Sequence, residues 1–327
     1  MTSQTGPDPD AIAAALAMRP LGRTGLQVTP VCIGGGPLGG MPKLFGYETP
    51  FERGVETALA AFDGPFNFLD TSNEYSDGES ERRIGEALRR RGGLPEGFVL
   101  QTKVDRDVRT GEYTGAQVRR SIEQSLERLG VDRVPVLHLH DPEHISFEEG
   151  VAAGGPLEEL VKIRDEGLAR FIGVAGGPVG LMSRYLQTGA FDALITHNRW
   201  TLVDRSADAL LDEAVSLGVG VINGAPFGGG ILARGTAATQ DYGYRPAGEE
   251  VLARIRRMEE ICAGAGVPLA AAALQFSTRD ERVAATIVGV SRPERIEETA
   301  RLAAWPIPEG IWPELEGLAA PRETWLN

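Results

Sequence analysis

The stretch FLDTSNEYSDGESE, residues 68–81, carries several side chains that can hold charge or move a proton. A short apolar run ends at Asp70, and Tyr75 follows five residues later. Two further apolar runs end at Lys103 and at His140. If these runs are neighbouring parallel strands, they bring a carboxylate, a phenol, an ammonium and an imidazole to one edge of the sheet.

These four groups suit the transfer of a proton to a carbonyl oxygen while a hydride reaches the carbonyl carbon. A free phenol has a pKa of about 10, which makes it a poor proton donor near neutral pH. An adjacent ammonium stabilises the phenolate, so we expect Lys103 to lower the pKa of Tyr75. Asp70 would keep the ammonium charged, and His140 would hydrogen-bond the substrate oxygen and fix its angle to the hydride donor.

Three other interpretations of these residues are weaker. A calcium loop that starts at Asp70 places Tyr75 where a glycine is required. His138 and His140 share one strand face and could bind a metal ion, but Lys103 would place a cation beside it. We therefore predict no metal site, and we expect His138 to be packed deeper in the protein interior with one hydrogen-bond partner. Lys103 alone could form a Schiff base, but Asp70 and Tyr75 favour an ion-paired lysine that stays protonated.

The acidic residues after Tyr75 have a simpler explanation. Asp77 and Gly78 form a turn that begins a helix. Glu79 and Glu81 fall in the first turn of that helix, where carboxylates complement the helix dipole. We expect both glutamates to lie on the solvent side.

Short apolar runs alternate with segments of helical period from residue 31 onward. The runs lack the alternation of a half-exposed strand, which is typical of parallel strands covered on both faces. We predict strands at residues 31–34, 66–70, 98–102, 134–140, 169–174, 193–197, 220–224 and 284–288. The helices predicted after them include residues 79–91, 114–130, 156–166, 206–218 and 292–302.

Eight β/α repeats in one chain of 327 residues favour a closed (β/α)8 TIM barrel. A doubly wound sheet is the alternative, but the glycine-rich run after residue 31 does not give G-x-G-x-x-G at the start of a helix. Residues 20–28 are typical of a β-hairpin, which would close the bottom of the barrel. We predict a flexible tail, residues 1–18, followed by a single barrel domain, residues 19–327. The glycine-rich stretch 227–248 is expected to be a mobile loop beside the site.

The composition limits the possible partners. The formal net charge is −13 and the pI is about 4.9, which disfavours binding to nucleic acid or to an anionic membrane. No stretch approaches the roughly 18 consecutive apolar residues that indicate a membrane span. Cys32 and Cys262 lie far apart and suit buried free thiols in a reducing compartment. We predict a cytoplasmic protein.

The sequence resembles the aldo-keto reductase family in several motifs that follow the family's order. They are Asn67-Phe-Leu-Asp-Thr-Ser-Asn-Glu-Tyr75, Thr102-Lys103, His140-Asp-Pro, Phe171-Ile-Gly-Val, Gly220-Val-Ile-Asn-Gly-Ala-Pro-Phe-Gly-Gly-Gly-Ile-Leu and Val290-Ser-Arg-Pro-Glu-Arg-Ile. The resemblance implies a (β/α)8 fold with an extended NADP or NAD laid across the barrel mouth. It also implies that Tyr75 is the general acid/base, with Asp70, Lys103 and His140 in the roles given above.

The resemblance further implies a set of cofactor contacts. They are Gly35, Asp70, Ala175, Gly176, His197, Asn198, Asn223, Ala225, Pro226, Phe227, Gly228, Gly230, Val290, Ser291, Arg292, Arg295 and Thr299. By their positions in loops, Tyr47, Arg199, Trp200 and Phe227 are expected to join Tyr75 and His140 in the substrate pocket.

Three positions depart from the common family pattern. Ala175-Gly176 replaces a Ser-Asn pair that usually binds the nicotinamide amide, and Gly224 replaces an aromatic residue that usually stacks on the ring. Gly289-Val290 replaces a Lys-Ser pair that often meets the adenosine phosphate. The preference for NADP or NAD is therefore open, although Arg292 or Arg295 could pair with a 2′-phosphate.

Within the family, the motifs look most like a branch of sugar 1-dehydrogenases that act on D-threo-aldoses, L-fucose and L-galactose, together with pyridoxal 4-dehydrogenases. This resemblance implies oxidation of an aldose to a lactone, or reduction of a carbonyl, on a small aldehyde, ketone or sugar substrate. Two alternatives are a non-catalytic cofactor-binding regulatory subunit and a metal-dependent barrel hydrolase. The sequence leaves the substrate, the direction and the oligomeric state open.

Overall fold

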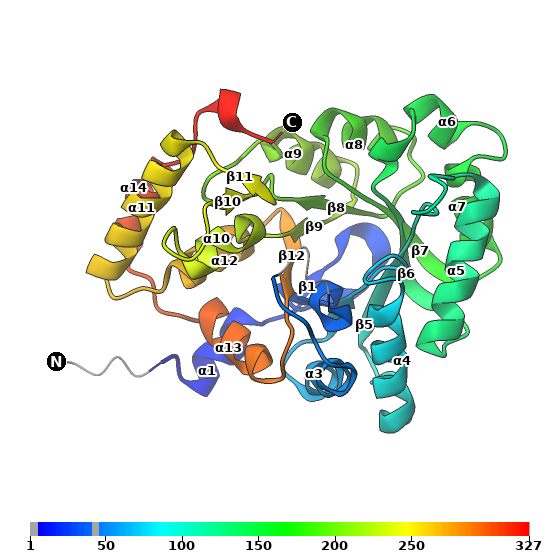
Figure 1. Ribbon diagram of the computed structural model, residues 1–327, viewed down its shortest axis with the longest axis horizontal. Helices are drawn as coiled ribbons and strands as arrows, with labels where there is room; N and C mark the ends of the chain where they lie inside the picture. Colours follow the sequence, from blue (N-terminus) through cyan, green and yellow to red (C-terminus); the bar gives the residue numbers. More distant parts are fainter. Residues whose placement is uncertain (1–5, 41–45, 327) are drawn as a thin grey trace.

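The computed structural model of the protein describes residues 6–40 and 46–326. Its centre is a closed barrel of parallel strands in the order β12-β3-β4-β5-β6-β7-β8-β9 (Figure 1). The strands are β3 (Val31–Gly34), β4 (Phe68–Asp70), β5 (Val99–Val104), β6 (Val134–His140), β7 (Ala169–Gly176), β8 (Ala193–His197), β9 (Gly220–Gly224) and β12 (Val283–Gly289). All eight predicted strands are present, so the prediction of a (β/α)8 barrel is confirmed.

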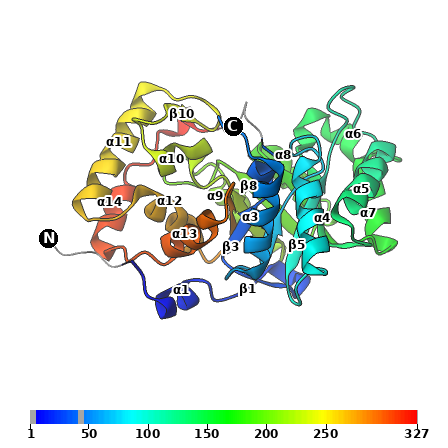
Figure 2. The ribbon, with the colours of Figure 1, turned by 60° about the horizontal axis from the view of Figure 1, so that its bottom comes forward.

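Helices surround the barrel and cover the outer faces of its strands (Figures 1 and 2). They are α3 (Phe51–Asp63), α4 (Glu79–Arg91), α5 (Gly115–Leu129), α6 (Phe147–Val151), α7 (Pro156–Asp165), α8 (Val179–Leu186), α9 (Asp208–Ser216), α11 (Glu249–Gly264), α12 (Leu269–Thr278), α13 (Glu294–Ala303) and α14 (Trp312–Glu316). Helix α5 shows how local sequence sets these bounds. The Thr114 side chain accepts a hydrogen bond from the Gln117 amide, and Gly130 ends the helix at φ 66°.

The strands divide their apolar side chains between two buried clusters. Ile33 and Leu69 point outward into a large cluster that includes helix residues such as Ile122. Cys32 and Phe68, their neighbours in sequence, belong to a smaller cluster inside the barrel. This division follows from the alternation of side chains along a strand, and it explains why the strands are apolar on both faces.

A hairpin closes the bottom of the barrel, as predicted. Strand β1 (Arg19–Pro20) pairs antiparallel with β2 (Gln27–Val28). Leu21 and Val28 are fully buried and belong to the inner cluster. The backbone at Gly22 approaches β9 so closely that a Cβ atom there would lie 2.3 Å from the Gly220 nitrogen, so only glycine fits.

The stretch 227–248, expected to be a loop, contains short regular elements. Helix α10 (Ile231–Arg234) is followed by β10 (Asp241–Tyr242) and β11 (Arg245–Pro246), which pair antiparallel. Near the N-terminus, α1 (Pro9–Ala15) begins after Asp8, and Leu16 beyond it is buried. Among the described residues, no single helix is long and apolar enough to cross a membrane; α11 and α12 reach that length only as a pair bent by 101°.

Glu81 corrects a sequence expectation. Glu79 is partly exposed and pairs with Arg82, but Glu81 is fully buried between α4, β5 and α5. Its carboxylate accepts a hydrogen bond of 2.6 Å from the Thr102 hydroxyl and lies 3.3 Å from Arg128 Nη1. The prediction that Glu81 faces solvent is therefore wrong, because α5 packs over the side of α4 that carries it.

Candidate active site

A cavity of about 620 Å³ opens at the carboxyl ends of the barrel strands. Asp70 ends β4, Lys103 lies one residue before the end of β5, and His140 ends β6. Because β4, β5 and β6 are neighbours in the barrel, these side chains converge. Tyr75 lies in the loop after β4, and all four side chains line the cavity. The structure thus brings together the four residues predicted to carry the chemistry.

Lys103 is at the centre of this group. Its ammonium donates hydrogen bonds to Asp70 Oδ2 at 2.8 Å, to the Thr71 carbonyl at 2.8 Å and to the Tyr75 hydroxyl at 3.0 Å. The side chains of Lys103 and Asp70 are each only 2% exposed, so this ion pair is nearly excluded from water. Gln101 donates to the other oxygen of Asp70 at 2.8 Å, which fixes the carboxylate.

The surroundings of Lys103 and Tyr75 raise both pKa values. Burial by itself would lower the pKa of Lys103, but Asp70 and Tyr75 reverse that effect, so the ammonium stays protonated as predicted. Burial raises the pKa of Tyr75, and the opposing effect of Lys103 is smaller. Lys103 thus lowers the pKa of Tyr75, as expected, but burial outweighs this effect, and the phenol keeps its proton at neutral pH.

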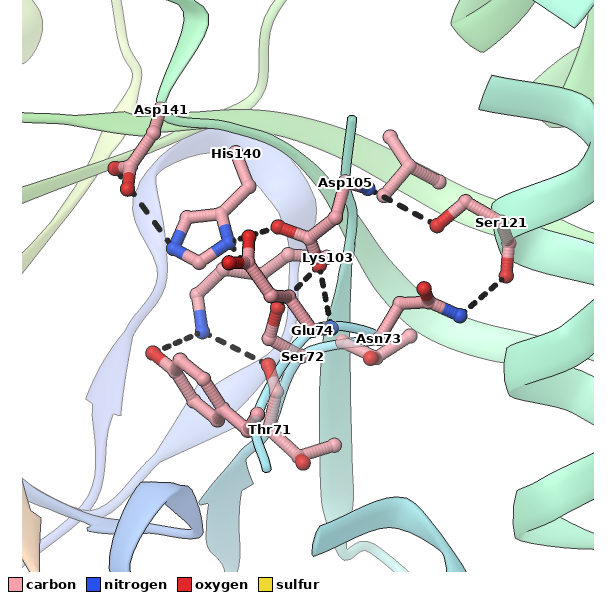
Figure 3. Close-up of polar contacts among 12 residues, drawn as sticks. Thr71, Ser72, Asn73, Glu74, Lys103, Asp105, Ser121, His140 and Asp141 are labelled. Carbon is pink, nitrogen blue, oxygen red and sulfur yellow. Dashed lines mark hydrogen bonds and ion pairs between the residues drawn. The ribbon is translucent and has the colours of Figure 1, made fainter. Parts of the chain in front are cut away.

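His140 is held by a carboxylate that the sequence prediction missed. Its Nδ1 contacts Asp105 and lies 3.1 Å from the Ser72 hydroxyl. Asp105 is 3% exposed and also accepts hydrogen bonds from Ser72 and from the Glu74 amide. Figure 3 shows Asp105 and Asp141 on opposite sides of the imidazole ring. Nδ1 therefore faces Asp105, while Nε2 faces Asp141 at 3.8 Å.

These carboxylates control the charge of His140. Burial lowers the pKa of the imidazole, but Asp141 and Asp105 outweigh burial and raise it to about 9. At neutral pH the ring is therefore an imidazolium that can donate from both nitrogens. Because Asp105 holds the proton on Nδ1, the proton on Nε2 is available to a substrate oxygen as a charge-assisted hydrogen bond.

Gln101, Lys103 and Asp105 organise the site from one strand. Gln101 and Lys103 lie in β5 and Asp105 directly follows its last residue, so the three side chains, two residues apart, share one face. Gln101 also lies 3.0 Å from Nε2 of His138, which is fully buried and whose pKa burial lowers well below the ordinary value. His138 is thus packed inside the barrel with a hydrogen-bond partner, as predicted. A spacing of two from Lys103 is the sequence signal that could have identified Gln101 and Asp105.

Ten of the residues predicted to contact a cofactor line the cavity: Asp70, Ala175, His197, Ala225, Pro226, Phe227, Gly230, Ser291, Arg292 and Arg295. Arg234, at the end of α10, lines the same cavity and was missed. Arg292 and Arg295 follow β12, so three guanidinium groups from two parts of the chain lie at this opening. Guanidinium groups match the geometry of phosphate, which makes this donor set suitable for a dinucleotide.

The other seven predicted contacts do not line the cavity: Gly35, Gly176, Asn198, Asn223, Gly228, Val290 and Thr299. Asn223 is fully buried and donates to the Trp200 carbonyl and the Ser277 hydroxyl at 2.8 Å each. The Gly35 amide donates to the Asp70 carbonyl at 2.7 Å. These donors already have hydrogen-bond partners in the barrel wall, so they do not face the cavity.

Four of the residues predicted for the substrate pocket line the cavity: Tyr47, Tyr75, His140 and Phe227. Arg199 and Trp200 do not. The Trp200 ring packs against Phe276 with 5.4 Å between ring centroids, and the Arg199 guanidinium donates to the His197 carbonyl at 3.2 Å. Both side chains are less than a tenth exposed, so they belong to the packed layer behind the cavity.

Glu74, Asp141 and Tyr244 also line the cavity and were missed by the sequence prediction. Glu74 and Asp141 each stand next to a predicted residue in the chain. Among the described residues, Asp141, Glu143 and His197 form the one group whose ligand atoms are close enough to hold a metal ion, within 4.8 Å of one another. This group includes neither His138 nor His140.

The mouth of this (β/α)8 barrel thus holds a charged lysine that donates to a half-buried tyrosine hydroxyl, with an imidazolium beside it. The sequence profile of the aldo/keto reductase family matches residues 30–320. The chain therefore belongs to the aldo/keto reductase family, as the motifs predicted, and is an oxidoreductase.

Similar proteins agree with this assignment. D-threo-aldose 1-dehydrogenase from Pseudomonas sp. is 31% identical, with 78% of this chain and 84% of the relative covered. L-galactose dehydrogenase from Arabidopsis thaliana is 30% identical, with 94% and 92% covered. Pyridoxal 4-dehydrogenase from Microbacterium luteolum is 29% identical, with 92% and 97% covered. These relatives belong to the branch that the motifs resemble.

A solved structure supports the fold independently. The holo form of an aldo-keto reductase from Bacillus halodurans superposes with a TM-score of 0.74, covering 93% of this chain and 96% of that one. The two sequences are 20% identical, so the likeness concerns the barrel architecture.

Proposed function

We propose that the protein is an NAD(P)-dependent oxidoreductase that transfers a hydride between the nicotinamide and the carbonyl carbon of an aldehyde, a ketone or a sugar. The observation that carries the proposal is the 3.0 Å bond from Lys103 Nζ to the Tyr75 hydroxyl in the cavity. An ammonium has donors only, so the Tyr75 oxygen accepts this bond. The proton of Tyr75 is then free to reach a substrate oxygen.

In carbonyl reduction, Tyr75 donates its proton to the oxygen on which negative charge develops. Lys103 stabilises the phenolate that remains, and the buried Asp70 keeps Lys103 charged. In the oxidation of a sugar hemiacetal to its lactone, the small fraction of Tyr75 that is ionised, which Lys103 stabilises, takes the hydroxyl proton. His140 donates from Nε2 to the same substrate oxygen, which holds this oxygen at a fixed angle and stabilises its charge.

Arg234, Arg292 and Arg295 are the residues that would hold the phosphate groups of the cofactor. When bound, the nicotinamide supplies the hydride in reduction and accepts it in oxidation. Arg295 pairs with Glu298 at 2.7 Å, and Arg292 lies 4.0 Å from Glu294. Both pairs are partly exposed to solvent, so each guanidinium group can exchange a carboxylate for a phosphate.

The proposal also covers the substrate class, the cellular compartment and the domain organisation. Relatives are named for D-threo-aldose, L-galactose and pyridoxal, which supports a small carbonyl or sugar substrate. Cys32 and Cys262 are both buried and free, which suits the reducing cytoplasm. Residues 19–327 would act as a single barrel domain, with residues 1–18 as a tail.

The test is a screen of NAD⁺ and NADP⁺ against aldoses and pyridoxal, and of the reduced cofactors against aldehydes, followed by nicotinamide absorbance. Tyr75→Phe should reduce turnover by at least about a hundredfold, because it removes the acid/base group. Cofactor affinity, measured by protein fluorescence, should be unchanged because the ring remains.

Three outcomes would contradict the proposal. Full activity of Tyr75→Phe would show that Tyr75 does not transfer the proton. Activity that is lost to a chelator and restored by zinc would favour the barrel hydrolase. Tight cofactor binding without turnover of any carbonyl or alcohol would favour the regulatory subunit.

A further inference from the structure

The charges around the cavity are divided by position. Arg292 and Arg295 follow β12, and Asp141 directly follows β6. In the order β12-β3-β4-β5-β6-β7-β8-β9, β12 and β6 are four strands apart in either direction, so they lie across the barrel from each other. Glu74, in the loop after β4, lines the cavity next to Tyr75. The cavity therefore has an arginine side and a carboxylate side.

We propose that Asp141 and Glu74 determine substrate specificity: they select uncharged, hydroxylated carbonyl compounds and reject anionic ones. This inference rests on the proposed function, in which the anionic dinucleotide takes the arginine side. The substrate is then left between Tyr75, His140 and these two carboxylates.

The oxygens of these two carboxylates are available to accept hydrogen bonds from a ligand. In residues 6–40 and 46–326, neither the Asp141 nor the Glu74 carboxylate receives a hydrogen bond, and the nearest cationic atom to the Asp141 carboxylate is His140 Nε2 at 3.8 Å. Their main chain is nevertheless fixed, because the Asp141 amide donates to Ala175 at 2.7 Å and the Glu74 amide donates to Asp105 at 2.9 Å. An ionised carboxylate only accepts, so these groups need donors from a ligand.

The geometry favours a hydroxyl on the carbon next to the reacting one. If the reacting oxygen accepts from His140 Nε2, the oxygen on the adjacent carbon comes near Asp141, which is 3.8 Å from that nitrogen. A hydroxyl there donates to the carboxylate in a charge-assisted bond. A substrate carboxylate or phosphate would instead meet like charge.

Other charged groups around this side do not cancel the effect. Lys103 is paired with Asp70, and His140 is paired with Asp105. Burial raises the pKa of Glu74, and Asp105 and Asp141 raise it further, whereas His140 and Arg106 lower it. Glu143, behind Asp141, adds a further carboxylate with one buried oxygen that lacks a hydrogen-bond partner. The excess of negative charge thus remains with Glu74, Asp141 and Glu143.

The experiment compares kcat/KM for para-carboxybenzaldehyde with kcat/KM for para-nitrobenzaldehyde in the wild type, Asp141→Asn and Glu74→Gln. Effects of a substitution on folding or cofactor binding change both kcat/KM values equally and cancel in the ratio. The intrinsic reactivity of each aldehyde is the same in every variant, so it cancels when the ratios of two variants are compared. We expect each substitution to raise the ratio by about tenfold, equivalent to about 1.4 kcal/mol. Asparagine is well suited to position 141, because the backbone there has φ 42°, which asparagine tolerates.

Asp132→Asn is the matched control, because it removes the same charge from an exposed position away from the cavity. Its ratio should equal that of the wild type, and added salt should weaken the discrimination most in the enzymes that retain both carboxylates. A second ratio, glyceraldehyde to propanal, should fall by about tenfold in Asp141→Asn, because the hydroxyl loses a charged acceptor.

The outcomes separate this inference from the proposed function. Unchanged ratios in both cavity variants, or an equal rise in Asp132→Asn, would overturn the inference while the reductase activity stands. If the wild type reduces none of the four aldehydes with either cofactor, the proposed function fails, and the specificity inference fails with it.

Discussion

Replacing Asp105 by asparagine should convert His140 from an imidazolium into a neutral imidazole at neutral pH. Asp105 is a positioning residue: it contacts Nδ1 of His140 and is itself held by Ser72 and by the Glu74 amide. Asparagine keeps the shape and one oxygen acceptor, but it removes the buried negative charge.

The size of the effect follows from the pKa of His140. The rise from the ordinary value of 6.5 to about 9 corresponds to roughly 3 kcal/mol in favour of the charged ring, at about 1.4 kcal/mol per pH unit. In Asp105→Asn, burial and Lys103 still lower the pKa, and they are opposed by Asp141 and, more weakly, by Glu74 and Glu143. We therefore expect the pKa to fall to about the ordinary value or below.

The change should also be visible in stability. Because the pKa of His140 is higher in the folded chain than in the unfolded chain, its protonation stabilises the fold fully below about pH 6.5, and this contribution is lost as the pH rises through about 9. The free energy of unfolding in urea should thus decline over this range in the wild type. The decline should be smaller in Asp105→Asn.

Histidine NMR measures the pKa directly, because the chain contains only four histidines. The pKa values of His138, His144 and His197 are all lowered from the ordinary value, mainly by burial. One ring resonance should therefore titrate at about pH 9 in the wild type, and none in Asp105→Asn.

Carbonyl reduction provides the functional readout. Above the pKa, His140 keeps the proton on Nδ1 and presents a lone pair at Nε2, so the rate should fall. This basic limb should move to lower pH in Asp105→Asn. Ser72→Ala is the control, because it removes a hydroxyl from the same network and leaves the carboxylate in place. If no histidine titrates near pH 9 in the wild type, or if the midpoint is the same in Asp105→Asn, the reasoning is refuted.

Two further predictions concern the framework. Lys103→Met should lower the free energy of unfolding by about 3–5 kcal/mol, because it leaves Asp70 buried without a cationic partner. The double variant Lys103→Met/Asp70→Asn should recover part of this loss in urea titrations. If it recovers none, loss of the ion pair is not the cause. Leu21→Ala should cost about 2–5 kcal/mol, since Leu21 is fully buried where the hairpin closes the barrel. The kcat of Leu21→Ala at low temperature should stay near that of the wild type, and a large loss of kcat would show that the hairpin also shapes the site.

Much of the architecture can be predicted from short segments of the sequence. The strands at residues 31–34, 134–140, 193–197 and 220–224 have the bounds predicted for them. These strands can be predicted from the sequence because strands buried on both faces need continuous apolar runs, and the turns between elements need glycine or polar residues. The convergence of Asp70, Tyr75, Lys103 and His140 was predictable for the same reason, since parallel strands deliver their carboxyl ends to one rim.

Contacts between elements were not predictable in this way. Whether Glu81 faces solvent depends on which side of α4 is covered by α5, and the pairing of Asp105 with His140 depends on the register of β5 against β6. Both features depend on how two segments pack against each other. The sequence analysis therefore missed them, although Asp105 lies only two residues from Lys103.

The sequence by itself determined which groups could exchange a proton and on which strands they stand. Only the tertiary structure decided their protonation states. The pKa of Tyr75 is the balance between removal from water, which favours the neutral phenol, and attraction to Lys103, which favours the phenolate. Both effects depend on distance and burial, and these are set when the barrel closes.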